Sequence, residues 1–128
     1  MGPGPNYVLY RPYHLTSLET PISIAKAYFD NEPTIAPIFD KPVAEAITIA
    51  KRDLKKGERL DGIGEYTVLG SIETYEKAKE DNLLPIGLVN KNTIVKQDIK
   101  KGEFITYDMV ELDKTTTIYK LRQLQEEM

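Results

Sequence analysis

Residues 51–60 read KRDLKKGERL, and residues 96–105 read KQDIKKGEFI, so one segment is nearly repeated within 128 residues. Both copies place an aspartate, an aliphatic residue and Lys-Lys-Gly-Glu in the same order, with a second aliphatic residue three positions after the glycine. A glycine there adopts a positive φ angle without steric penalty, and the aspartate ahead of it can bond to local backbone. Each copy is therefore predicted to be a strand, a tight exposed turn and a second strand.

The aliphatic residues of the two copies are expected to point into one shared core. They are Leu54, Leu60, Ile99 and Ile105. Two related hairpins in a chain of this length predict a pseudo-symmetric β core within one domain, which is long enough to be stable without metals or disulfides.

Helices are predicted where apolar residues recur every three or four positions, at 16–30, 72–81 and 115–125. Either Ser71 or Thr74 could cap the second of them. Strands are predicted at 43–50, 66–70 and 93–95. The stretch 43–50 could also suit a helix through its alanines, but its β-branched residues favour a strand. The fold class is therefore α+β, with an N-terminal strand, helix and proline-rich arm at 1–42 and a β domain with a C-terminal helix at 43–128.

Composition excludes several classes of protein. The absence of cysteine excludes disulfides, zinc knuckles and cysteine nucleophiles. A net charge of -3, with basic residues spread along the chain, argues against a nucleic-acid partner. No apolar run reaches the roughly 20 residues that span a bilayer, and the first residues do not form a signal peptide. A single histidine without clustered carboxylates argues against a metal site, and the expected location is the cytoplasm.

The stretch GIGEYTVLG, residues 62–70, invites comparison with a dinucleotide-binding loop. The third glycine of Gly-x-Gly-x-x-Gly would fall at Thr67, and no strand-to-helix unit of about 30 residues surrounds it. The residues also contain no P-loop, so no cofactor site is expected in this chain.

Two groups of residues could bind a ligand. His14 is either an acid/base group beside Arg11, which would clamp an anion, or a histidine that caps the junction of strand and helix. The turn lysines are either solvated or a basic rim for an anionic ligand. Those lysines are Lys55, Lys56, Lys100 and Lys101. Eight tyrosines against three phenylalanines indicate either a domain interface or ordinary partial burial.

Residues 50–70, 83–88 and 95–112 together resemble the SAF domain, a module with a β-clip fold. With YRPYHLTSLETPISIA at 10–25 ahead of them, nearly the whole chain is similar to the C-terminal region of homoserine-dehydrogenase-like NAD(P)-dependent oxidoreductases. The resemblance implies a β-clip core and an accessory, substrate-side role beside a Rossmann domain in the same or a separate chain. That domain would bind NAD(P), and this chain would not be catalytic alone.

The same resemblance implies positions for five site residues and assigns none of them a catalytic role. Arg11, Tyr13 and His14 would face the substrate cleft or a domain interface, and Asp61 and Tyr66 would lie in the loop after the first turn.

Two alternatives stay open. One is a stand-alone β-clip module that binds a carbohydrate or sugar acid through its loops. The other is a structural domain that forms homo-oligomers through its tyrosine-rich front and the C-terminal apolar stripe, which consists of Ile118, Leu121 and Leu124.

Overall fold

The chain divides into two units, residues 1–40 and residues 41–128. The computed structural model describes residues 8, 10, 12, 15–36 and 42–127, and each unit is considered by itself. Arg11, Tyr13 and His14 lie outside the described residues, as do Tyr7 and Leu9 of the predicted N-terminal strand. Their predicted roles therefore stay predictions.

The first unit contains one continuous helical segment. Helix α1 spans Thr16–Ala25 and passes directly into the π-helix η1, Lys26–Asp30. Asn31 then ends the segment in a left-handed conformation, with φ of 54°, a conformation that asparagine tolerates better than most residues. The helix predicted at 16–30 is confirmed, although its last turn is wider than an α-helical turn.

No side chain in this helical segment is buried. Leu18 exposes 62% of its surface, Ile22 59% and Phe29 78%. These residues belong to the apolar side of the helix that the 3.6-residue spacing predicted. The first unit therefore presents an apolar helix side that its own described residues leave uncovered.

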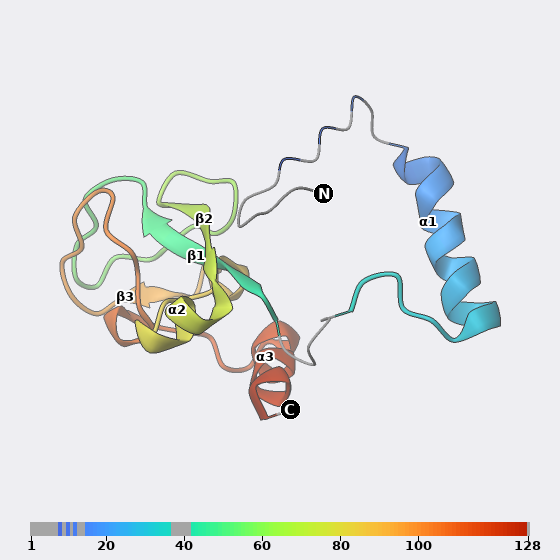
Figure 1. Ribbon diagram of the computed structural model, residues 1–128. Helices are drawn as coiled ribbons and strands as arrows, with labels where there is room; N and C mark the ends of the chain where they lie inside the picture. Colours follow the sequence, from blue (N-terminus) through green and yellow to red (C-terminus); the bar gives the residue numbers. More distant parts are fainter. Residues whose placement is uncertain (1–7, 9, 11, 13–14, 37–41, 128) are drawn as a thin grey trace. The chain divides into compact units, whose positions relative to one another are not determined.

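The second unit begins with an antiparallel pair of strands (Figure 1). Strand β1, Ala44–Ala50, pairs with β2, Val68–Thr74, so that Ala44 lies opposite Thr74 and Ala50 opposite Val68. The strand predicted at 43–50 is confirmed, because its β-branched residues Ile47 and Thr48 are both buried between neighbours.

The remaining elements are short and surround this pair. They are helix α2, Tyr75–Glu80; the 3-10 turns η2, Ile86–Leu88, and η3, Tyr107–Met109; strands β3, Ile94–Val95, and β4, Val110–Glu111; and helix α3, Thr117–Glu127. Strands β3 and β4 pair antiparallel. The second unit is therefore mixed helix and strand with small antiparallel strand pairs, which fits the predicted α+β class.

The helix predicted at 72–81 starts later than expected. Residues 72–74 continue strand β2, and the helix begins only at Tyr75. Thr74 is the N-cap, and its hydroxyl accepts a hydrogen bond from the backbone N–H of Lys77 at 3.3 Å. Of the two caps that the sequence offers, Ser71 and Thr74, the structure therefore uses the later one.

The two repeated segments meet in space. Leu54 donates its backbone N–H to the carbonyl of Ile99 at 2.8 Å, and Ile99 donates back to Leu54 at 3.0 Å. Each turn forms as the glycine predicts, with Gly57 at φ of 85° and Gly102 at 86°. The strands beside each turn, however, do not pair with each other: Leu54 pairs with Ile99 of the other copy, and the residues after each turn pair with the segment just before the other copy.

Backbone hydrogen bonds at the ends of the two copies follow the same reciprocal pattern. Leu60 donates to the carbonyl of Thr93 and Ile105 to that of Thr48, both at 2.9 Å. These donors lie 45 residues apart, as do the acceptors, so the two copies are related by an approximate two-fold arrangement.

The predicted shared core is confirmed. Leu54, Leu60, Ile99 and Ile105 each expose 2% or less of their surface and belong to one buried cluster. Burying side chains of this size contributes about 1.5–3 kcal/mol each. The two turns themselves lie at the end of the second unit away from α3 (Figure 1).

Candidate functional site

The four predicted rim lysines lie together at the end formed by the two turns. Lys55 places its ammonium nitrogen 2.6 Å from an oxygen of Asp98. Lys100 does the same with Asp53 at 3.0 Å. Each aspartate therefore neutralises a lysine of the opposite copy.

The same two aspartates also hold the backbone of the opposite turn. The second oxygen of Asp98 accepts the N–H of Lys56, and that of Asp53 accepts the N–H of Lys101, both at 3.0 Å. The Lys101 N–H and then the Lys100 ammonium lower the pKa of Asp53 below its usual value. The Lys55 ammonium, followed by the N–H of Lys56, lowers the pKa of Asp98.

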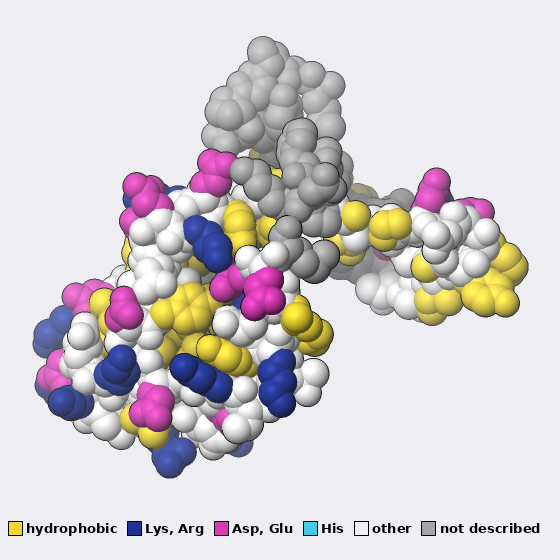
Figure 2. Space-filling view, turned by 90° about the horizontal axis from the view of Figure 1, so that it is seen from below, with side chains coloured by type: hydrophobic (Ala, Val, Ile, Leu, Met, Phe, Trp, Pro, Cys, Tyr) yellow, Lys and Arg dark blue, Asp and Glu magenta, His cyan; other side chains and the backbone are white. Residues whose placement is uncertain are grey.

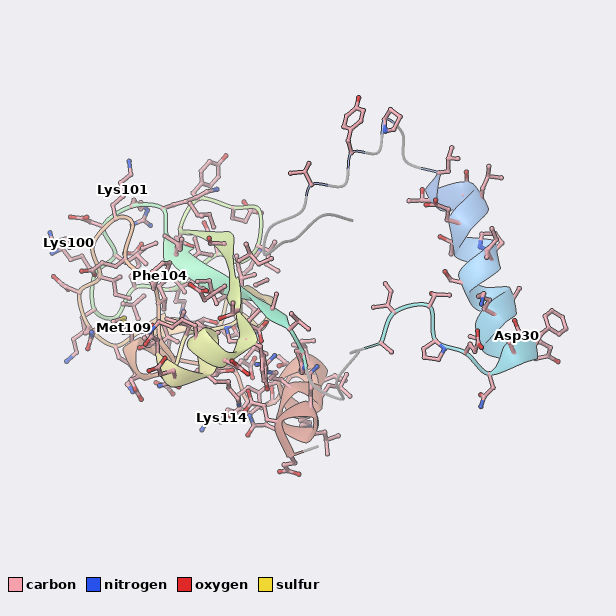
Figure 3. All side chains as sticks on the ribbon, in the orientation of Figure 1. Asp30, Lys100, Lys101, Phe104, Met109 and Lys114 are labelled. Atoms are coloured by element: carbon pink, nitrogen blue, oxygen red, sulfur yellow. The ribbon has the colours of Figure 1, made fainter. Side chains whose placement is uncertain are left out.

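Half of the predicted rim is thus occupied by internal ion pairs. The ammonium groups of Lys56 and Lys101 form no ion pair with any residue that the structure describes. Lys100 and Lys101 point outward from their loop (Figure 3). Acidic and basic side chains are interspersed over the face of the second unit seen in Figure 2. The geometry brings the four lysines together but gives two of them a structural task.

Asp61 shapes the loop between the first turn and β2. Its carboxylate accepts the backbone N–H of Tyr66 at 2.9 Å and that of Thr67 at 3.1 Å, and it also bonds the Thr67 hydroxyl. Burial acts to raise the pKa of Asp61, but these hydrogen bonds outweigh it and lower the pKa. Tyr66 exposes 81% of its surface and leaves its ring free for a partner.

The residues around Asp61 do not fit a dinucleotide. Gly62 and Gly64 both have positive φ angles, but the chain continues from them into strand β2 and not into a helix. A pyrophosphate needs the exposed N–H groups of a helix N-terminus after such glycines. The stretch therefore lacks the turn-to-helix arrangement of a dinucleotide-binding loop.

A second site was missed by the sequence reasoning. A pocket of about 410 Å³ lies among β1, α2, η3 and α3. Its lining consists of Glu45, Tyr75, Ala78, Lys79, Asn82, Leu83, Tyr107, Tyr119, Arg122, Gln123 and Glu126. It is called here the tyrosine–arginine pocket.

Arg122 is the centre of this pocket. Its guanidinium lies 2.6 Å from Glu45 and 2.8 Å from Glu126, and the side chains of Arg122 and Glu45 expose only 12% and 13%. Burial acts to lower the pKa of Arg122, but the bonds to Glu126 and Glu45 raise it above the usual arginine value. Both carboxylates are therefore engaged with a cation, and the network ties α3 to β1.

Three tyrosines also line the pocket, Tyr75, Tyr107 and Tyr119. The guanidinium carbon of Arg122 lies 5.9 Å from the ring centroid of Tyr75, within the range of a cation–π contact. The Tyr107 hydroxyl is buried and has no hydrogen-bond partner among the described residues. Burial raises the pKa of Tyr107 to about 12, so the hydroxyl stays neutral.

Little in the sequence could have located this pocket. The spacing of Arg122 and Glu126, four positions apart at the end of the helix predicted at 115–125, was the one local signal. Glu45 and Tyr107 are distant in sequence, and only the folded strands bring them to α3.

An apolar groove of about 480 Å³ also runs along α3, and Glu45 and Arg122 line both this groove and the tyrosine–arginine pocket. The apolar side chains that line it are Ala46, Ile63, Pro85, Ile86, Leu88, Ile118 and Leu121. Two residues of the predicted C-terminal stripe are therefore groove residues, and that stripe is exposed.

Two further classes of site were sought. Among the described residues, no cluster of three or more histidine, aspartate or glutamate side chains could hold a metal ion. Within the same part of the chain, no helix has both the length and the apolar character needed to span a bilayer.

Comparison with known proteins assigns no family to the chain. No protein-family model matches the chain, and no curated protein matches it.

Proposed function

We propose that this chain is an accessory, substrate-side domain of a homoserine-dehydrogenase-like NAD(P)-dependent oxidoreductase. Its second unit would be a SAF-like β-clip module, and a Rossmann domain in the same or a separate chain would bind NAD(P) and transfer the hydride. Support for the β-clip comes from the two repeated segments, whose strands pair with each other across an approximate two-fold arrangement.

The observation that carries the proposal is the uncovered apolar side of α1 and η1. Leu18, Ile22 and Phe29 expose 59–78% of their surface, and an isolated helix of this length is marginal in water. Such a helix needs an apolar surface to pack against. The segment that the resemblance links to the catalytic domain is the same segment whose apolar side its own unit leaves uncovered.

The proposal divides the work between the two domains. Residues 61–70 do not fit a dinucleotide, so the cofactor belongs to the Rossmann domain. Arg11, Tyr13 and His14 directly precede α1 in the chain and are the proposed substrate-facing residues. Asp61 would act through the shape of its loop, because its carboxylate is occupied by backbone N–H groups.

Association in trans tests the proposal. A Rossmann polypeptide of a homoserine-dehydrogenase-like oxidoreductase, truncated before its own counterpart of YRPYHL, is mixed with the full chain. Light scattering on a size-exclusion column should show a complex that contains the two polypeptides in equal numbers. The Ile22→Asp variant should lose that complex, because a charge on the apolar side of α1 cannot be buried without a partner.

The matched control is Ile72→Asp, which changes an isoleucine of the second unit that is 76% exposed, against 59% for Ile22. Its complex should persist. The proposal fails if the wild-type chain does not bind the Rossmann polypeptide, or if the chain alone binds NADPH tightly.

A further inference from the structure

Ion pairs attach one side of helix α3 to the rest of the second unit. Arg122 reaches Glu45 of β1 at 2.6 Å, and Glu126 accepts from Arg122 and lies 3.5 Å from Lys79 of α2. No residue of α3 is buried. A helix on the surface of a globular domain ordinarily packs with its apolar side and exposes its polar side.

The apolar stripe of α3 is correspondingly exposed. Ile118 exposes 50% of its surface, Leu121 55% and Leu124 58%. The adjoining groove extends this apolar surface onto the rest of the second unit through Ile63 and Ile86. Contiguous exposed apolar surface next to a polar anchor indicates an interaction site.

We propose that α3 pairs with α3 of a second copy of this chain, antiparallel across a two-fold axis at Leu121. The stripe is self-complementary about that residue, because Ile118 and Leu124 each lie three positions from it. The axis places Leu121 against itself and Ile118 against Leu124 of the second copy. A two-fold interface requires this kind of matching of one surface with itself.

Charges at the two ends of the helix favour the same arrangement. Lys114 lies just before α3 and Glu127 is its last residue, at seven and six positions from Leu121. An antiparallel pair brings Lys114 near Glu127 of the second copy on both sides of the axis, and the two helix dipoles oppose each other favourably. Lys114, beside α3 in Figure 3, forms no ion pair with any described residue.

A second copy fits this surface better than an unrelated partner, because the apolar pattern and the charge pattern share one centre. The interface uses α3 and its groove, so it is independent of the proposed oxidoreductase role, which uses α1. The two proposals therefore fail separately.

The mass of the full chain in solution tests the interface. Sedimentation equilibrium should give twice the 14.5 kDa of one chain. Leu121→Asp should give a monomer, because two carboxylates would meet at the axis. Leu121 is exposed, so the variant should keep its far-UV circular dichroism spectrum.

Two controls separate α3 from other apolar surfaces. Ile72→Asp, on β2, and Ile22→Asp, on α1, should both leave the dimer intact. Lys114→Glu should weaken dimerisation by about three- to tenfold, and the double change Lys114→Glu with Glu127→Lys should restore it. A monomeric wild-type chain, a dimer that survives Leu121→Asp, or a dimer lost in Ile22→Asp would each overturn the proposal.

Discussion

The two turns of the second unit, residues 51–60 and 96–105, form the same set of hydrogen bonds and ion pairs. They differ only at residues that take no part in those shared interactions. In both, an aspartate of one copy holds a lysine ammonium and a backbone N–H of the other. In both, the glutamate after the glycine accepts a backbone N–H of its own turn, at 3.0 Å for Glu58 and 2.7 Å for Glu103. The residues that brace the two turns against each other are therefore among those that the two copies share.

The differences lie outside this bracing. Arg52 forms an ion pair with Glu58, whereas the second copy has Gln97 at the equivalent position. Arg59 of the first copy corresponds to Phe104 of the second, which exposes 48% of its surface. The comparison teaches that shared residues explain the fold, and that residues found in only one copy are better candidates for a function of that copy.

The largest effect should come from the paired core residues. Leu54→Ala and Ile99→Ala should each lower the free energy of unfolding by about 2–5 kcal/mol, because each leaves a cavity in a buried cluster. Urea unfolding followed by circular dichroism measures both, with the exposed Ile72→Ala as control. A much smaller loss for one of the pair would show that the copies are not energetically equivalent.

The turn glycines should come next. Gly57→Ala and Gly102→Ala meet no atom within 4 Å, so their cost should be the conformational one of placing a side chain at φ of 85° and 86°. That cost is about 1–2 kcal/mol for each. Gly87→Ala also enters open space but at an ordinary φ angle, and thermal unfolding should show it to be nearly neutral.

The bracing aspartates give a pH-dependent prediction. Both have folded-state pKa values lowered below the unfolded value of about 3.9, so their stabilisation is present above that pH and is lost as the pH falls through the folded pKa. Asp53→Asn and Asp98→Asn should therefore flatten the acid limb of the stability curve by equal amounts. Unfolding measured from neutral to strongly acidic pH tests this, and unequal slopes would contradict the reciprocal bracing.

The features of the fold that the sequence predicted are those that depend on interactions between residues close together in the chain. The turns, their aliphatic core residues and the strand at 43–50 depend on local chemistry, namely a glycine φ angle, β-branched residues and alternation of apolar positions. The cross-pairing of the copies was not predicted, because a repeat specifies two similar turns without specifying which strand pairs with which.

The candidate site was less accessible from the sequence for the same reason. The four turn lysines were identified from the sequence. Their ion pairs with Asp53 and Asp98 were not, because each pair joins segments about 45 residues apart that meet only in the folded chain. The tyrosine–arginine pocket combines β1, α2, η3 and α3, and no short pattern carries that combination. Long-range contacts decide both cases.

The smallest effect should come from making the first copy more like the second. Arg52→Gln removes an ion pair whose arginine side chain is 48% exposed, and solvent screens such pairs. Glu58 would keep its bond from the Lys55 N–H, so the turn should keep its shape. We expect no measurable change in unfolding free energy at either low or high salt. A clear, salt-dependent loss would instead mean that the first turn depends on an interaction that the second lacks, and that Arg52 serves the fold and is no longer a candidate for a function of its copy.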